Sequence, residues 1–115
     1  MREQAWKAKL AATADAIGTG AIYAAIQGKD VPDCDGGENG CNTAIRALAN
    51  IPDDILVVGG KQYAKTDNKY YLIYVKEGKG ISIDACKGDD DCDSSLFGTP
   101  KLYEFGDLEG AAASE

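Results

Sequence analysis

"REQAWKAKLAATADAIGTGAIYAAI", residues 2–26, decides the fold, because it contains no proline and is dense in Ala, Lys, Gln and Leu. These residues have high helix propensity, so we expect a helix over residues 2–27. Its larger apolar residues recur at spacings that keep them on one side of a 3.6-residue repeat. The sequence therefore predicts a long helix with one covered face, formed by Trp6, Leu10, Ile17 and Ala21.

Three glycines mark special positions in and after this helix. Gly18 and Gly20 each cost on the order of 1 kcal/mol relative to Ala, so we expect a bend or a close backbone contact there. Gly28 is a suitable helix C-cap, because glycine adopts the left-handed conformation easily. We therefore expect the helix to end just before Gly28.

Short runs rich in Tyr, Ile and Val follow beyond residue 60, separated by turn residues: "KQYAKT", "NKYYLIYV" and "GISIDA". This pattern predicts an antiparallel β-meander. The middle run is expected to be central, because both of its sides carry bulk: Tyr71, Ile73 and Val75 on one, Tyr70, Leu72 and Tyr74 on the other. The preceding "DDILVVGG" is either a further strand or an extended approach to the sheet, and "KLYEF" is expected to add a last strand.

The predicted organisation is a single domain over residues 1–115. It has a helix over about 2–27, a loop and short helix over about 28–52, a β-meander over about 55–86, and a C-terminal loop and tail over about 87–115. The predicted fold class is α+β: a long N-terminal helix packed on a three- to four-stranded antiparallel β-meander, with two disulfide-closed loops.

The charge and residue types exclude several functions. Nineteen acidic residues against twelve basic ones give a net charge of -7, which repels phosphate backbones and anionic lipid surfaces. Nucleic acid is therefore not an expected partner. The chain has no histidine and no glycine-rich phosphate motif, so catalytic sets that need a histidine are excluded. We expect no enzyme, and a secreted enzyme that uses only carboxylates is the remaining catalytic alternative.

The four cysteines form two close pairs in Gly- and Asp-rich stretches. Closing a short loop is easiest, so local disulfides are favoured among the three possible connectivities: Cys34 with Cys41, and Cys86 with Cys92. A zinc site is disfavoured, because the spacings are C-x6-C and C-x5-C and no histidine is present. Disulfides predict a location outside a reducing cytosol.

We expect no cofactor, and calcium is the alternative for which the sequence offers suitable ligands. The stretch "CKGDDDCDSS" brings together acidic side chains and hydroxyls, the hard oxygen ligands that calcium prefers. The EF-hand spacing is not met, and a solvated acidic loop without a metal explains the same residues. The residues that supply these oxygens are Asp89, Asp90, Asp91, Asp93, Ser94 and Ser95.

The start of the chain, "MREQAWKAKL", has no apolar signal region, and the sequence has no apolar run of about 18 residues that would span a membrane. An exported protein needs an export signal. We therefore expect that an upstream signal or anchor has been removed, with a mature secreted domain as the alternative.

The long Ala-rich helix, the loop that follows it, the short antiparallel meander and the late segment between Cys86 and Cys92 together resemble the soluble part of a type IV pilin or type II secretion pseudopilin. The resemblance implies an extracellular filament subunit, made as a membrane-anchored precursor, whose partners are other pilin subunits. Its function would be assembly, in adhesion, motility, DNA uptake or secretion. Major pseudopilins carry a calcium ion in a late loop, which the resemblance places at Asp89, Asp91 and Asp93.

The predicted assembly face lies on the long helix and consists of Trp6, Leu10 and Ile17. Residues 2–10 of a straight helix span about 13 Å, so the sheet is not expected to reach its first turns. Trp6 and Leu10 are therefore expected to be partly exposed and covered by helices of neighbouring subunits. The alternative for these residues is an ordinary core. The competing function is a small secreted disulfide-stabilised binding domain that uses its loops for recognition.

Overall fold

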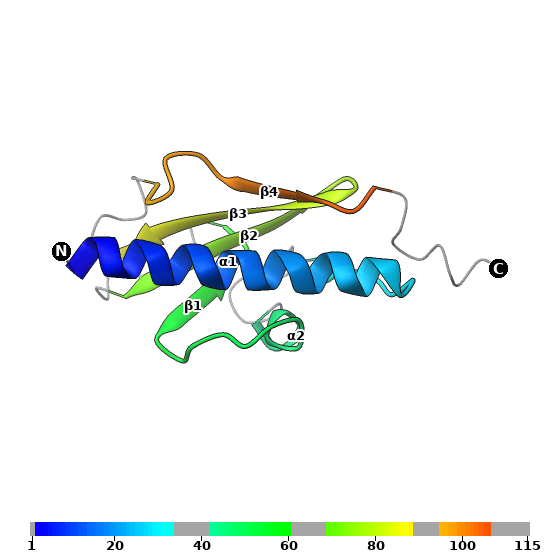
Figure 1. Ribbon diagram of the computed structural model, residues 1–115, viewed down its shortest axis with the longest axis horizontal. Coiled ribbons are helices and arrows are strands. Elements are labelled where there is room, and N and C mark those ends of the chain that lie inside the picture. The colour runs from blue at the N-terminus through cyan, green and yellow to red at the C-terminus, as the bar shows by residue number, and fades with distance from the viewer. Residues whose placement is uncertain (1, 34–41, 61–68, 89–94, 107–115) are drawn as a thin grey trace.

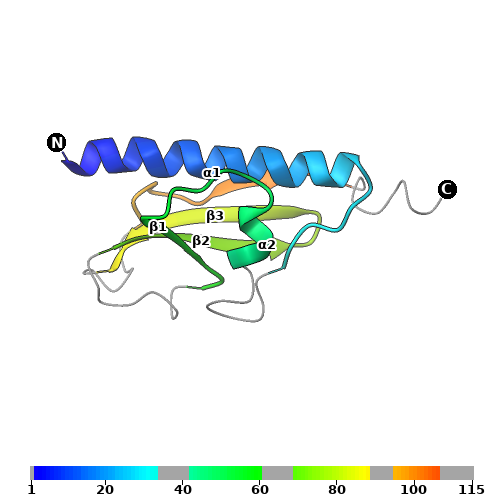
Figure 2. The ribbon, with the colours of Figure 1, turned by 90° about the horizontal axis from the view of Figure 1, so that it is seen from below.

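The computed structural model describes residues 2–33, 42–60, 69–88 and 95–106. Along the chain they form α1 (Arg2–Ile26), α2 (Asn42–Arg46), β1 (Ile55–Val58), β2 (Tyr70–Glu77), β3 (Gly80–Lys87) and β4 (Lys101–Glu104). The helix α1 lies lengthwise against one face of the sheet (Figures 1 and 2). The predicted α+β class is confirmed.

The helix α1 ends where the sequence predicts. Gly28 has a φ of 77°, and its N–H donates to the carbonyl of Ala25 at 2.9 Å. The N–H of Lys29 donates to the carbonyl of Ala24, also at 2.9 Å. These two bonds form a Schellman motif, in which a left-handed glycine satisfies the last carbonyls of a helix.

The sheet has the order β1-β2-β3-β4, and its first pair differs from the prediction. The pairs β2–β3 and β3–β4 are antiparallel, as expected, but β1 runs parallel to β2, with Ile55 opposite Tyr70. The prediction of a purely antiparallel meander is therefore wrong, and the sheet is mixed. The run "ILVV" of β1 is almost entirely buried, and such continuous apolar runs are typical of strands in parallel pairing. The strand expected at "KQYAKT" lies outside the described residues.

The strand β2 is central, with β1 and β3 on its two sides, as its bulky residues predicted. Tyr70, Leu72 and Tyr74 belong to the main core, while Tyr71 and Ile73 belong to a second buried cluster with Val58 and Cys86. Tyr70, Tyr71 and Tyr74 serve packing, because each is less than a tenth exposed.

The main core lies between α1 and the sheet. From Leu10 onward the helix contributes buried side chains, which meet apolar side chains of β1, β2 and β3. Burial of one large aliphatic side chain contributes roughly 1.5–3 kcal/mol, so this contact is a main source of stability. The buried residues of α1 in this core are Leu10, Ala14, Ile17, Ala21 and Ala25.

The segment between α1 and β1 is held by two polar anchors. The hydroxyl of the buried Tyr74 donates to the carbonyl of Pro32 at 2.7 Å. The guanidinium of Arg46 donates to the carbonyls of Ile51 and Ile55, at 3.0 and 3.1 Å. The second anchor links the end of α2 to the start of β1. Within the described ranges, no helix combines the length and the hydropathy needed to cross a membrane.

Candidate functional site

The three residues of the predicted assembly face lie on the inner side of α1. Leu10 and Ile17 are both 0% exposed, and Trp6 is partly buried against the same core. The expectation that Leu10 is partly exposed is therefore wrong, because α1 lies along the sheet from its first turns (Figure 2). Leu10 and Ile17 belong to the domain's own core, and Trp6, which is partly exposed as expected, packs against that core.

Trp6 joins the start of α1 to the start of β2. Its indole stacks on the ring of Tyr70, with ring centroids 4.1 Å apart and an angle of 16° between the planes. The ammonium of Lys9 lies 4.5 Å from the Trp6 centroid, and that of Lys87 lies 5.5 Å from the Tyr70 centroid. The stack thus has a cation on each side, which adds cation–π attraction to the apolar contact.

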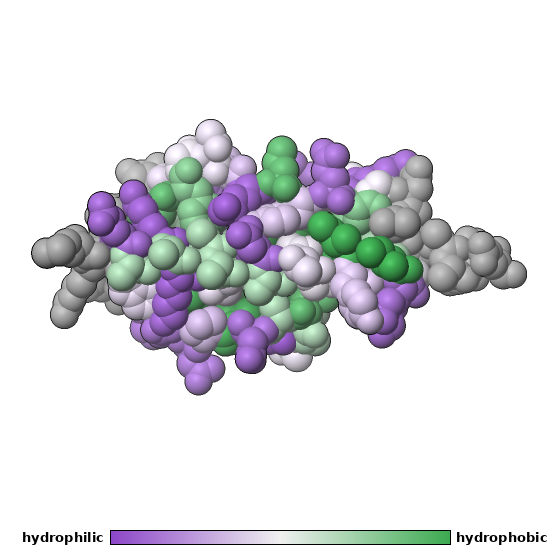
Figure 3. All heavy atoms as spheres, in the orientation of Figure 1, coloured by the Kyte–Doolittle hydropathy of each residue, from purple (hydrophilic) through white to green (hydrophobic). Residues whose placement is uncertain are grey.

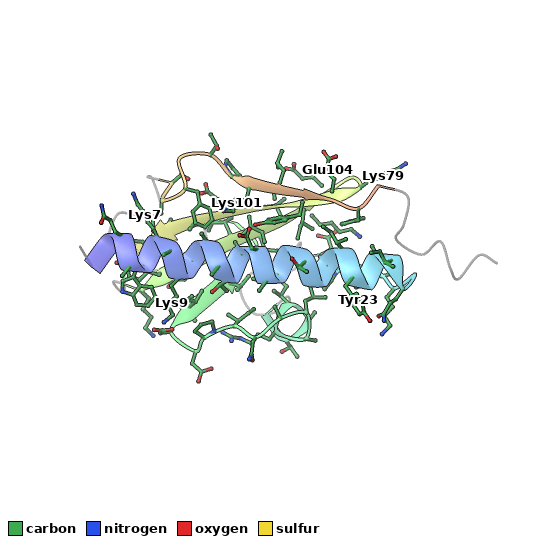
Figure 4. The ribbon with its side chains drawn as sticks, in the orientation of Figure 1. Lys7, Lys9, Tyr23, Lys79, Lys101 and Glu104 are labelled. Atoms are coloured by element: carbon green, nitrogen blue, oxygen red, sulfur yellow. The ribbon has the colours of Figure 1, made fainter. Side chains whose placement is uncertain are left out.

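Lys9 also pairs with a carboxylate at the turn before β1. Its Nζ lies 2.9 Å from Asp54 Oδ2 and 3.1 Å from Oδ1, and Figure 4 shows it reaching from α1 to the side of β1. The hydrogen bond from Lys9 holds the pKa of Asp54 below its ordinary value. Because 53% of the Asp54 side chain is exposed, solvent screens the pair and its contribution to stability is small.

The two glycines inside α1 are sites of close contact, as predicted. A Cβ at Gly18 would lie 2.3 Å from Cδ1 of the Tyr103 ring. A Cβ at Gly20 would lie 2.2 Å from the carbonyl oxygen of Leu48. The missing side chains therefore let β4 and the turn after α2 pack directly on the helix.

Tyr103 crosses α1 at Gly18 and reaches a carboxylate beyond it. Its hydroxyl donates to Asp15 Oδ1 at 2.6 Å, and Lys101 Nζ lies 3.8 Å from the same oxygen. Burial raises the pKa of Tyr103, and the neighbouring Asp15 carboxylate adds to the increase. The phenol is therefore neutral at physiological pH and acts as a hydrogen-bond donor that positions β4 on the helix.

The outer face of α1 points to solvent and carries little charge. Between Gln4 and Ile26, ten side chains are exposed, and only Lys7 and Asp15 among them are charged. Figure 3 views this face, where pale and green surfaces follow the helix. We call the eight uncharged exposed positions the outer face: Gln4, Ala5, Ala8, Ala12, Ala16, Thr19, Tyr23 and Ile26.

The outer face combines small side chains with two large apolar ones. Tyr23 is 61% exposed and Ile26 is 58% exposed, the highest values among large apolar residues of the described helices. A groove runs beside them, between the outer face and the turn after α2, lined by Ala12, Ala16, Gly20, Tyr23, Leu48 and Ala49 among others. The sequence pattern of small residues at "AKLAATADA" is the signal that could have identified this face.

The cysteine and calcium predictions fall mostly outside the described residues. Cys86 is buried in β3 and its sulfur is part of a disulfide, but Cys34, Cys41 and Cys92 lie in ranges that are not described. Both pairings therefore stay predictions. The predicted calcium ligands also lie outside the described residues: Asp89, Asp91 and Asp93. Elsewhere, in the part of the chain that is described, no three His, Cys, Asp or Glu side chains gather to hold a metal.

Sequence reasoning missed the role of Asp84. This carboxylate is 8% exposed in β3, where it accepts hydrogen bonds from the Ser95 hydroxyl and from the N–H of Ala85. The N–H of Leu96 donates to the carbonyl of Ala85 at 2.8 Å. These bonds dock the chain at Ser95 and Leu96 onto β3. An aspartate inside the apolar run "GISIDA" is the signal that could have revealed it.

Comparison with known proteins gives this chain no family. No protein-family model matches it, and no curated protein and no solved structure matches it. The pilin resemblance therefore stays a prediction, and the functional argument rests on the outer face of α1.

Proposed function

We propose that this chain is the globular part of a filament subunit of the type IV pilin or type II secretion pseudopilin kind, and that it acts by assembly. The proposal is supported by the arrangement of one long helix laid lengthwise on a four-stranded sheet. The parallel strand β1 departs from the antiparallel meander on which the resemblance was based.

The observation that carries the proposal is the outer face of α1. A surface helix normally presents charged and polar residues to solvent, whereas eight of the ten exposed side chains between Gln4 and Ile26 are uncharged. Exposed apolar surface, such as that of Tyr23 and Ile26, commonly marks a site that a partner covers. This outer face replaces the assembly face predicted from the sequence.

The small residues of the outer face suit another helix as the partner. Ala8, Ala12 and Ala16 follow one another at every fourth position, along one side of the helix. Small residues at this spacing let two helix backbones approach closely. The partner that we propose is α1 of a neighbouring subunit. When the two contacting surfaces differ and the rotation between subunits does not close into a ring, such a contact repeats and builds a filament.

The remaining parts of the proposal concern the location of the protein, its membrane anchor and a bound calcium ion. We propose an extracellular or cell-surface subunit, anchored in the membrane by an upstream segment before assembly. The disulfide at Cys86 supports an oxidising compartment. A calcium ion held by Asp89, Asp91 and Asp93 is part of the same proposal. Calorimetric titration with calcium tests it, since a triple Asp→Asn variant is expected to lose the heat of binding.

The test of the function is filament formation by the protein joined to its encoded upstream segment. Antibody against the chain should label surface filaments in electron micrographs. The double variant Ala12→Glu, Ala16→Glu places two charges on the outer face and is expected to abolish the filaments. The matched control is Thr99→Glu, which adds a charge at an exposed position between β3 and β4 and is expected to leave them intact.

The possible outcomes distinguish an error in the proposed contact surface from an error in the proposed function. Both variants replace exposed residues, so the free energy of unfolding of the isolated domain should change by about 0.5 kcal/mol or less. Its melting temperature should therefore change little. Filaments that persist in the double variant would refute the outer face as the contact. A protein that is released as a free monomer, without filaments, would refute the proposed function and favour the secreted binding domain.

A further inference from the structure

We draw no further inference here: the strongest candidate, the groove that Glu77, Ile81 and Leu102 line beside β3 and β4, carries no proposal because nothing in the described part of the structure shows what covers it.

Discussion

A single methyl group added at Gly18 tests the packing of β4 on α1. The new Cβ would lie between 2.3 and 2.5 Å from three carbons of the Tyr103 ring. Carbon atoms pack at about 3.5–4.0 Å, so the ring would have to move by roughly 1 Å or more. One of the three carbons is Cγ, at the root of the ring, so rotation of the ring alone does not relieve the overlap. The movement would strain or break the 2.6 Å hydrogen bond from Tyr103 to Asp15.

Two opposing effects set the magnitude for Gly18→Ala. Alanine in a helix interior is more favourable than glycine by roughly 1 kcal/mol. Overpacking typically costs about 1–3 kcal/mol, and the loss of a hydrogen bond costs about 0.5–1.5 kcal/mol. We expect the costs to exceed the gain, so that the free energy of unfolding falls by about 1–3 kcal/mol. For a chain of this size the melting temperature should fall by roughly 4–12 °C.

Thermal and urea unfolding, followed by circular dichroism, measure the effect. Thr19→Ala is the matched control, because it replaces the exposed neighbouring residue and is expected to stabilise the helix slightly. In a Tyr103→Ala background the methyl group has room, so Gly18→Ala should become stabilising there by roughly 1 kcal/mol. If Gly18→Ala raises the melting temperature while Tyr103 is present, the close contact between α1 and β4 is wrong.

Other predictions concern the core, one ion pair and the cysteines. Leu10→Ala should cost about 2–5 kcal/mol in unfolding experiments, whereas Ile26→Ala should cost about 0.5 kcal/mol or less; equal effects would contradict the burial of Leu10. Because Lys9 lowers the pKa of Asp54 in the folded state, their pair stabilises the fold above the ordinary value of 3.8 and this stabilisation is lost as the pH falls through the lowered pKa. The small stability difference between the protein and Asp54→Asn should therefore vanish in acid, and a difference that grows there would refute the pair. Peptide mapping without reduction should find two local disulfides, Cys34 with Cys41 and Cys86 with Cys92. Any crossed linkage would refute this prediction.

The candidate site could be predicted only in part. The sequence predicted an assembly face on α1, the element on which our proposal also rests, but it selected the side with large apolar residues. Leu10 and Ile17 are residues that the domain needs for its own core, whereas Ala8, Ala12 and Ala16 lie on the outer face. A large apolar side chain is expected to be buried, but its size does not indicate whether residues of the same chain or of a neighbouring subunit bury it.

The sequence by itself determined the local structure of this protein. Helix propensity and the glycine at position 28 set the extent of α1, and the alternation of bulky residues set β2 as a strand covered on both sides. Only the tertiary structure decided the direction of β1, because an apolar run such as "ILVV" is typical of parallel pairing but does not require it, and the direction depends on how the chain reaches the sheet. The tertiary structure also decided that Tyr103 packs against Gly18 and Leu48 packs against Gly20. The sequence does not show these contacts, because the residue that fills the space beside a glycine comes from far along the chain.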